Sequence, residues 1–573
     1  MKTKPIISTN PNKKVSRLVK PSSLIVTVVS VYIILYHTQS YALSWTIIPS
    51  VQTQEIYSDN ITLAPSGSEQ SAFVTAINPG VSITGQSPRS TMNFNYRMQN
   101  LYNAGGNNSL SIYNQLQSRS HNTFIPNKLF LDSNTSISQQ NINNNLVGAN
   151  NINGSTNSTN VYSFGLSPYW TPHFANYASG IARVNFNTIA TGGGATSNNN
   201  FNSPLNTNSN AMSDSVNLAE TINLNSGSYF QRVNWNLSFN NNENYRINSP
   251  TISFQNSNGR IGVPVNAYFN VFAQGGYSNN NYQSSAVNNT GNNSSGAYYT
   301  VGGQWRPSQR FNITAGAGNN SFVTVFLSPM ARLTSTTTYS NNAVGTNFGQ
   351  YSPGNAGGNT GQNSPATGGG NSGQNWTTAI NYQARRSTWS LTHNNTTTTS
   401  QQILAQNQIF PAQNLTNNGI SNTDLNQRII NNPTLTNQVI VTKTWNLSVS
   451  FTPGKSTFSA NVYDQDYTYQ TSGNNQKVIG VSGTWNWPFA TRTSAYVRPQ
   501  WQHIDNQGSA NNSQYYTVAI GLNRTITSQL NGVLEFRHMT QTSNGNANNI
   551  LPGIGLANDY QENRVTASLF MRF

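Results

Sequence analysis

The last nine residues of the chain, Val565-Thr566-Ala567-Ser568-Leu569-Phe570-Met571-Arg572-Phe573, decide its fold. Every second position of this segment is apolar: Val565, Ala567, Leu569, Met571 and Phe573. Because successive side chains of a β-strand point to opposite faces, one face of this strand suits hydrocarbon and the other suits water.

The same period of two recurs along the chain, and helical spacing is absent from these segments. It is clear in Met92 to Met98, Val233 to Phe239, Ile479 to Trp487 and Leu530 to Phe536. Many strands with one apolar and one polar face fit either a two-sheet sandwich or a membrane barrel with a wet lumen.

The N-terminus has the features of a secretory signal. Six of the 29 Lys and Arg residues precede Leu24, and an apolar stretch runs from Leu24 to Tyr36 before the small-x-small pattern Ser40-Tyr41-Ala42. This order predicts a signal peptide over residues 1–42. An uncleaved membrane anchor is the alternative, although the apolar stretch is shorter than the roughly 20 residues that span a bilayer.

Together, the secretory signal and the C-terminal strand favour the membrane barrel over the two-sheet sandwich. The five apolar residues that end on Phe573 resemble the assembly signal of bacterial outer-membrane barrels. We therefore expect residues 43–573 to form one transmembrane barrel in the outer membrane of a Gram-negative cell, with outer-membrane lipid and the barrel-assembly machinery as partners.

The connections support an up-and-down antiparallel topology. Short joints with Pro or small polar residues alternate with long Asn/Gly/Ser stretches at 142–159, 191–213, 279–296, 343–374 and 402–437. Outer-membrane barrels have short periplasmic turns and long extracellular loops. We predict about 24 strands, within 22–26. An even number of strands places both termini of the barrel domain on the periplasmic side.

Composition excludes other classes of protein. Only 8% of residues are charged and 35% are apolar, and there is no Cys for disulfides or thiolate chemistry. The net charge of +15 falls to +9 once the six N-terminal cations are removed, because 23 Lys and Arg then face 14 Asp and Glu. No basic run remains, so we expect no nucleic-acid partner.

Several short motifs, in order, resemble the PEP-CTERM system-associated outer-membrane β-barrel proteins, which include porin-type barrels. They begin at Trp45-x-x-x-Pro49 and Glu55-x-Tyr57-x-Asp59-Asn60 and continue through Leu129-x-Leu131-Asp132, Ser167-Pro168-Tyr169-Trp170 and Gly303-x-Trp305-x-Pro307-Ser308-x-Arg310. The resemblance implies an outer-membrane location and an association with exopolysaccharide production and surface-protein sorting. It implies no catalytic residues.

The sequence contains no convincing enzymatic site. His503 with Asp505 could form a hydrolytic pair, and Asp464 with Asp466 could offer oxygen ligands to calcium. Solvated strand ends are the simpler explanation of both patterns. We therefore predict no enzyme activity, no metal and no cofactor.

The inward face of the predicted strands is polar. Its charged candidates are Arg97, Arg232, Arg498, Glu535, Arg537 and Arg572. Amides and phenols bind sugar hydroxyls, and arginines favour anions, so this lining suits neutral or mildly anionic saccharides. Any wet lumen, however, needs polar residues.

Three hypotheses from different classes follow. The leading hypothesis is a channel or secretion-associated component for exopolysaccharide export, with polysaccharide and export-system components as partners. An unplugged lumen of this size would leak, so we expect loop 343–374 or 402–437 to fold inward. The alternative is a surface-display or adhesion protein whose Asn-rich loops bind matrix while the barrel is an anchor. An amyloid-like Asn-rich β protein is a third hypothesis.

Overall fold

The computed structural model describes the barrel and the ends of its loops. The described residues are 44–105, 109–142, 150–153, 158–192, 212–247, 249–281, 295–330, 332–342, 373–406, 433–470, 472–507, 512–544 and 559–573. The predicted signal peptide, residues 1–42, lies outside them.

The regular elements are almost all strands: β1 (Ser44–Ser58), β2 (Ala72–Gln86), β3 (Ser90–Asn103), β4 (Ser109–Ile125), β5 (Leu129–Asn141), β6 (Ser158–Trp170), β7 (His173–Phe174), β8 (Ala178–Gly192), β9 (Ser215–Ser226), β10 (Asn234–Arg246), β11 (Ser249–Pro264), β12 (Phe269–Asn281), β13 (Gly296–Ser308), β14 (Phe311–Gly318), β15 (Asn320–Met330), β16 (Leu333–Asn342), β17 (Gly373–Gln383), β18 (Ser387–Thr399), α2 (Ser400–Gln406), β19 (Val439–Phe451), β20 (Thr457–Tyr469), β21 (Asn475–Ala490), β22 (Thr493–Gln507), β23 (Asn512–Thr525), β24 (Leu530–Asn544) and β25 (Tyr560–Arg572). Within the described residues, no helix is long and apolar enough to cross a membrane.

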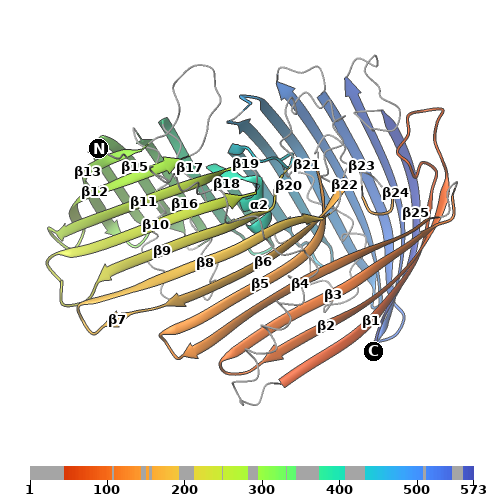
Figure 1. Cartoon of the computed structure of the whole chain (residues 1–573), viewed down its shortest axis with the longest axis horizontal. Coiled ribbons are helices and arrows are strands. Elements are labelled where there is room, and N and C mark those ends of the chain that lie inside the picture. Colours follow the sequence, from red (N-terminus) through yellow and green to blue (C-terminus); the bar gives the residue numbers. More distant parts are fainter. Residues whose placement is uncertain are drawn as a thin grey trace, which may run out of the picture.

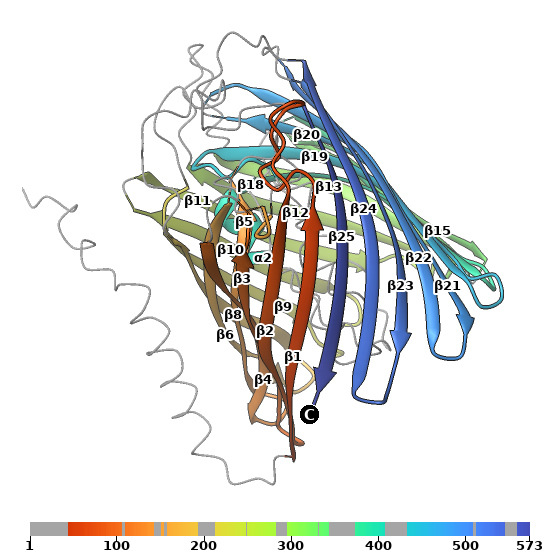
Figure 2. The ribbon, with the colours of Figure 1, turned by 90° about the vertical axis from the view of Figure 1, so that its right-hand side faces the viewer.

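The strands form one closed antiparallel barrel (Figure 1). Each long strand pairs with its neighbours along the chain, and β1 pairs with β25 from Ser50↔Arg572 to Ser58↔Arg564 to close the wall. The two-residue β7 pairs only with β8, so 24 strands make the wall. This confirms the predicted up-and-down barrel and its strand number. Figure 2 shows β1 beside β25, with the C-terminus at the end where β1 starts.

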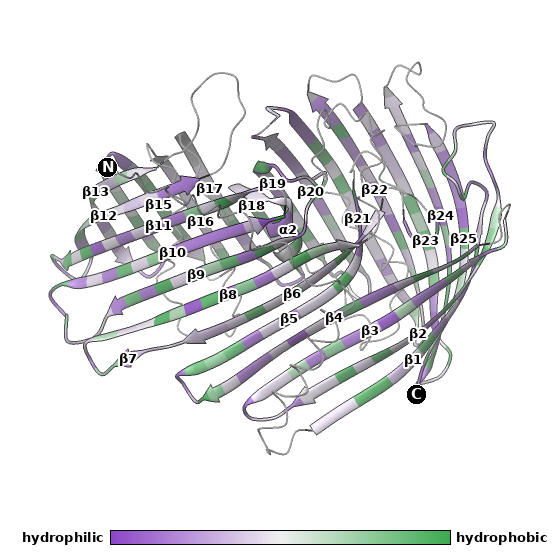
Figure 3. Cartoon of the chain, viewed as in Figure 1, coloured by the Kyte–Doolittle hydropathy of each residue, from purple (hydrophilic) through white to green (hydrophobic). Residues whose placement is uncertain are grey.

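The two faces of the wall differ as the alternation predicts. On β25 the side chains of Val565, Leu569 and Phe573 are 41%, 48% and 61% exposed, whereas Glu562 and Arg564 on the opposite face are buried. Figure 3 shows apolar and polar residues alternating along the strands. The exposed apolar face points outward, where lipid would cover it.

Connections of different length gather at the two ends of the barrel. One end, the turn rim, carries short connections such as 87–89, 309–310 and 491–492. The other end, the loop rim, carries the long connections, including 193–214 and 343–372. All the long connections lie at one end, as predicted, but the loop rim also has short connections at 247–248 and 319, so long and short connections do not alternate throughout.

The wall is lower at the loop rim between β14 and β17. β14 has 8 residues and ends at Gly318 opposite Thr300, whereas β11 has 16 residues. Beyond this low section the taller strands on either side approach each other. Val439 of β19 packs there in one buried cluster with Ile252 and Phe254 of β11.

Candidate functional site

The lumen wall between β1 and β4 is a lattice of amides around one arginine. Arg97 on β3 donates from Nε and Nη2 to Oε1 of Gln115, at 3.0 and 2.5 Å, and from Nη1 to Oε1 of Gln52 at 3.3 Å. Asn78 donates to both Gln52 and Gln54, at 3.5 and 3.4 Å. Side chains of this kind bind sugar hydroxyls as readily as they bind each other.

On β24 and β25 the same inner face holds paired charges. Arg537 Nη2 lies 2.9 Å from Glu535 Oε1, and Arg564 Nη2 lies 2.7 Å from Glu562 Oε1. Tyr496 of β22 donates its hydroxyl to Glu535 at 2.6 Å. Each carboxylate is buried and paired within its own strand, so these pairs add no net charge, and Ser58 of β1 donates to Glu562 across the closure.

A stack of planar side chains crosses four strands near the turn rim. Phe130 and Tyr169 are stacked with ring centroids 4.8 Å apart, His121 stacks on Phe130 at 5.8 Å, and the guanidinium of Arg183 lies 4.0 Å above Tyr169. Asp132 joins the two ends, with Oδ1 2.7 Å from His121 Nδ1 and Oδ2 3.1 Å from Arg183 Nη1. The stack forms a partly exposed, charged ledge on the inner wall.

The loop-rim mouth is bridged by residues of the β18–β19 loop, which we call the crossbar: residues 399–406, including α2, and 433–438. Asn244 of β10 donates to Thr399 Oγ1 at 3.2 Å, and Gln402 donates to Asn242 Oδ1 at 3.2 Å. Asn437 Oδ1 accepts from the backbone N–H of Ser213 at 2.8 Å, and its backbone carbonyl accepts from Arg246. These contacts join β18 and β19 to β10 and the residues before β9.

Apolar packing fixes the crossbar to the inner wall. Leu404 of α2 and Leu435 lie in one buried cluster with Val161 of β6, Ile189 of β8 and Met212. The backbone N–H of Leu435 also donates to the carbonyl of Ile142, beyond β5, at 2.9 Å. Figure 1 shows α2 inside the outline of the barrel. The described ends of loop 402–437 therefore fold inward as predicted, whereas loop 343–372 lies outside the described residues.

A second loop segment packs into the mouth on the β1–β4 side. Ile152 is buried in a cluster with Ile56, Val74 and Leu101 on the inner faces of β1, β2 and β3. Asn151 beside it donates to Gln99 Oε1 at 2.8 Å. The mouth is thus narrowed from two sides.

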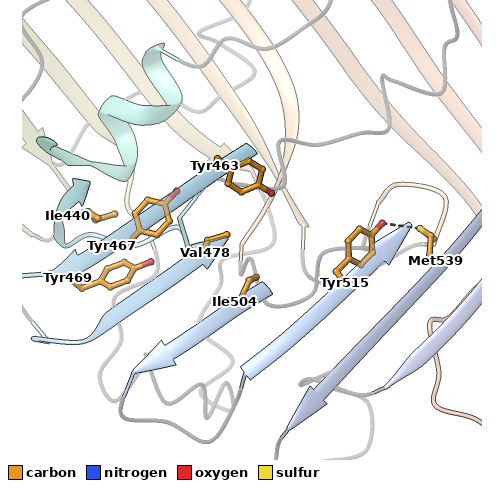
Figure 4. Packing of buried hydrophobic residues seen from close by; sticks show 8 residues of the cluster. All are labelled: Ile440, Tyr463, Tyr467, Tyr469, Val478, Ile504, Tyr515 and Met539. Carbon is orange, nitrogen blue, oxygen red and sulfur yellow. Dashed lines mark hydrogen bonds between the residues drawn. The ribbon is translucent and has the colours of Figure 1, made fainter. Parts of the chain in front are cut away.

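The inner wall of β19–β24 near the loop rim is aromatic, which the alternation did not predict. Its buried cluster contains Ile440, Tyr463, Tyr467, Tyr469, Val478, Ile504, Tyr515 and Met539 (Figure 4). The Tyr515 hydroxyl lies 3.3 Å from Met539 Sδ. A run such as Val439-Ile440-Val441, apolar on both faces, is the one sequence signal that could have indicated apolar contacts inside the mouth.

The predicted lumen residues occupy different positions. Arg97, Glu535 and Arg537 are buried on the inner face, and Arg498 lies on the inner face of β22 with its guanidinium 4.2 Å above the Tyr496 ring. Arg572 lines a small cavity together with Arg97. Arg232 is exposed in the turn before β10 and not on a strand face.

The residues weighed for catalysis or metal binding face outward near the loop rim. Lys477 Nζ lies 3.2 Å from Asp464 Oδ2, and the ladder places Asp505 opposite Lys477. In the part of the chain that the structure describes, no group of three or more His, Cys, Asp or Glu could hold a metal ion.

No family model and no curated protein matches this chain. Among solved structures, the FrpB iron transporter from Neisseria meningitidis, in its F5-1 apoprotein form, is 10% identical with a TM-score of 0.43, covering 92% of this chain and 81% of that chain. The siderophore receptor PirA from Pseudomonas aeruginosa is 8% identical with a TM-score of 0.35, covering 92% and 80%. A loop-deleted OmpT, an outer membrane protein of Vibrio cholerae, is 7% identical with a TM-score of 0.28, covering 93% and 100%.

At these identities and scores, none of these proteins' activities transfers to this chain. Its own strand pairing defines the class: a closed 24-strand antiparallel β-barrel of the outer-membrane type, with a polar lumen and a mouth narrowed by its loops.

Proposed function

We propose that this protein is an outer-membrane channel that opens when its crossbar leaves the mouth, and that it exports exopolysaccharide to the cell surface. The observation that supports a channel most directly is the crossbar in the mouth of the barrel. It is held by side-chain hydrogen bonds, by the backbone hydrogen bond from Leu435 to Ile142 and by one apolar cluster, and none of these contacts belongs to the ladder of the wall.

The lumen below the crossbar supports a hydroxyl-rich solute. A cavity of about 600 Å³ near the turn rim is lined by residues of six neighbouring strands, β16 to β21, and its polar side chains include Asn381, Ser390, Ser448, Ser459 and Ser482. Such groups exchange hydrogen bonds with sugar hydroxyls at little cost in desolvation. The link to exopolysaccharide rests on the resemblance of the sequence motifs to PEP-CTERM-associated barrels.

The chain has no Cys, so an engineered disulfide can lock the crossbar. Ser213 Oγ and Asn437 Oδ1 lie 3.0 Å apart, which suits the double variant Ser213→Cys/Asn437→Cys. In cells that lack the native gene, we expect the wild-type protein and the single variant Ser213→Cys to restore surface polysaccharide. The double variant should restore it only after reduction.

Export that continues without the gene, or through the oxidised double variant, would contradict the proposal. If cells without the gene export normally but no longer attach to matrix, the barrel is an adhesion anchor instead. Surface abundance of each variant, measured by labelling of intact cells, controls for failed assembly.

A further inference from the structure

Charge is segregated along the axis of the barrel. The eleven connections at the turn rim contain no Asp or Glu but carry nine cations: Arg89, Lys128, Arg232, Arg310, Arg332, Arg385, Arg386, Lys455 and Arg492. All but Arg89 are exposed. The turn rim is therefore a ring of positive charge with nothing to neutralise it in the turns themselves.

The loop rim has the opposite charge. In the described parts of its connections there are four acids, Asp59, Glu69, Asp214 and Asp559, and no Lys or Arg. On the outer face just below this rim, Asp464, Asp466 and Asp505 lie beside Lys443 and Lys477, which leaves one carboxylate in excess there. In the described connections, the net charge thus changes sign from the turn rim to the loop rim.

Between the rims the lumen wall is basic. The inner faces of the described strands carry three carboxylates, Asp132, Glu535 and Glu562, against nine arginines: Arg97, Arg119, Arg183, Arg246, Arg260, Arg498, Arg537, Arg564 and Arg572. Arg332 of the turn rim also lines the 600 Å³ cavity, so the positive rim continues into the lumen.

We infer that the turn rim is the entrance for an acidic, carboxylate-bearing polysaccharide, which moves from the turn rim to the loop rim. This inference rests on the proposed channel and adds its substrate class and direction. Cations around a low-dielectric opening concentrate a polyanion there and raise its rate of capture. Many cations engaging one chain bind it far more tightly than each does alone.

Binding of lipid headgroups would explain cations at the membrane interface but not the arginines inside. Headgroups reach only the outer edge of the rim, whereas the excess of arginine extends along the lumen wall. A solute that enters the lumen encounters both sets of charges. The observations therefore favour the polymer over the lipid.

The test uses the folded full chain in detergent micelles, where binding can be measured whether or not the channel conducts. The probe is a fluorescent oligogalacturonate, and a neutral maltooligosaccharide of equal length is its control. The rim variant Arg385→Gln/Arg386→Gln is compared with the loop-end variant Lys443→Gln/Lys477→Gln, which removes the same number of charges. Resistance to SDS before heating confirms that each barrel is folded.

We expect the rim variant to weaken oligogalacturonate binding about tenfold or more and the loop-end variant to weaken it less than about threefold. Neither variant should change the binding of the neutral oligosaccharide. Equal losses in the two variants, equally tight binding of the neutral sugar, or binding of phosphatidylglycerol without binding of oligogalacturonate would each overturn the inference. Conductance, which tests the channel itself, is a separate measurement.

Discussion

Thr399 at the end of β18 and Asn244 near the end of β10 share a hydrogen bond of 3.2 Å across the mouth of the barrel, although 155 residues separate them in the chain. Seven strands of the wall lie between β10 and β18, and this contact bypasses them all. Such a contact is not needed to build the wall, so its effect is on the mouth.

Removing the apolar contact of α2 should open the mouth. Leu404→Ala deletes a buried side chain from the cluster that fixes the crossbar, which typically costs about 2–5 kcal/mol. We expect faster uptake of a bulky antibiotic that outer membranes exclude, with unchanged heat stability of the barrel. The neighbouring Ile403→Ala, outside that cluster, is the control, and equal uptake by both variants would count against a role for α2.

Breaking one buried ion pair should destabilise the barrel beside its closure. Arg564→Leu leaves Glu562 buried and without its cation, at a cost of about 3–5 kcal/mol. The double variant Glu562→Gln/Arg564→Leu should recover most of that loss. Urea unfolding in lipid vesicles measures both, and a single variant no less stable than the double would show that the pair does not stabilise the closure.

The C-terminal aromatic should matter for assembly in cells more than for stability. Phe573 is 61% exposed on the outer face, so Phe573→Ala removes little packing. We expect a reduced amount of folded barrel in the outer membrane but unchanged refolding of purified protein. Phe570→Ala, on the inner face of the same strand, should reduce the stability of the purified protein more than the amount of barrel assembled in cells.

The ledge near the turn rim should tune ion selectivity. Asp132→Asn removes the carboxylate that faces His121 and Arg183 and leaves the guanidinium in place. In a variant with an open mouth, we expect the chloride-to-potassium permeability ratio to rise by roughly twofold. Arg183→Gln should lower it, and reversal potentials in a salt gradient distinguish the two directions.

Sequence reasoning predicted the wall well because a barrel strand must alternate. The outward face of Val565 to Phe573 and the strand number follow from a period of two and from the connections. Even Glu220, which alternation places on the lipid side, lies there in an unbroken ladder opposite Asn241, five residues from the start of β9. A strand that extends to the loop rim can carry such a residue beyond the hydrocarbon.

The mouth could not be predicted in the same way. Contacts such as Gln402 with Asn242 or Leu404 with Ile189 join segments more than 150 residues apart and leave no period in the sequence. Arg232 was predicted to face the lumen, but β10 begins two residues later, at Asn234, so Arg232 lies in a turn. Strand boundaries are the part of such a prediction that fails most often. The charge segregation became visible only once the connections had been assigned to the two rims.

The most direct test of the account is the single-channel conductance of two proteins in planar bilayers: the wild type and a variant in which residues 401–437 are replaced by a short Gly/Ser turn. Thr399 and Val439 are already paired, so a tight turn can close that hairpin. We predict rare, small openings for the wild type and large, stable steps for the variant. Equal conductance of the two folded proteins would contradict the claim that the crossbar closes the channel.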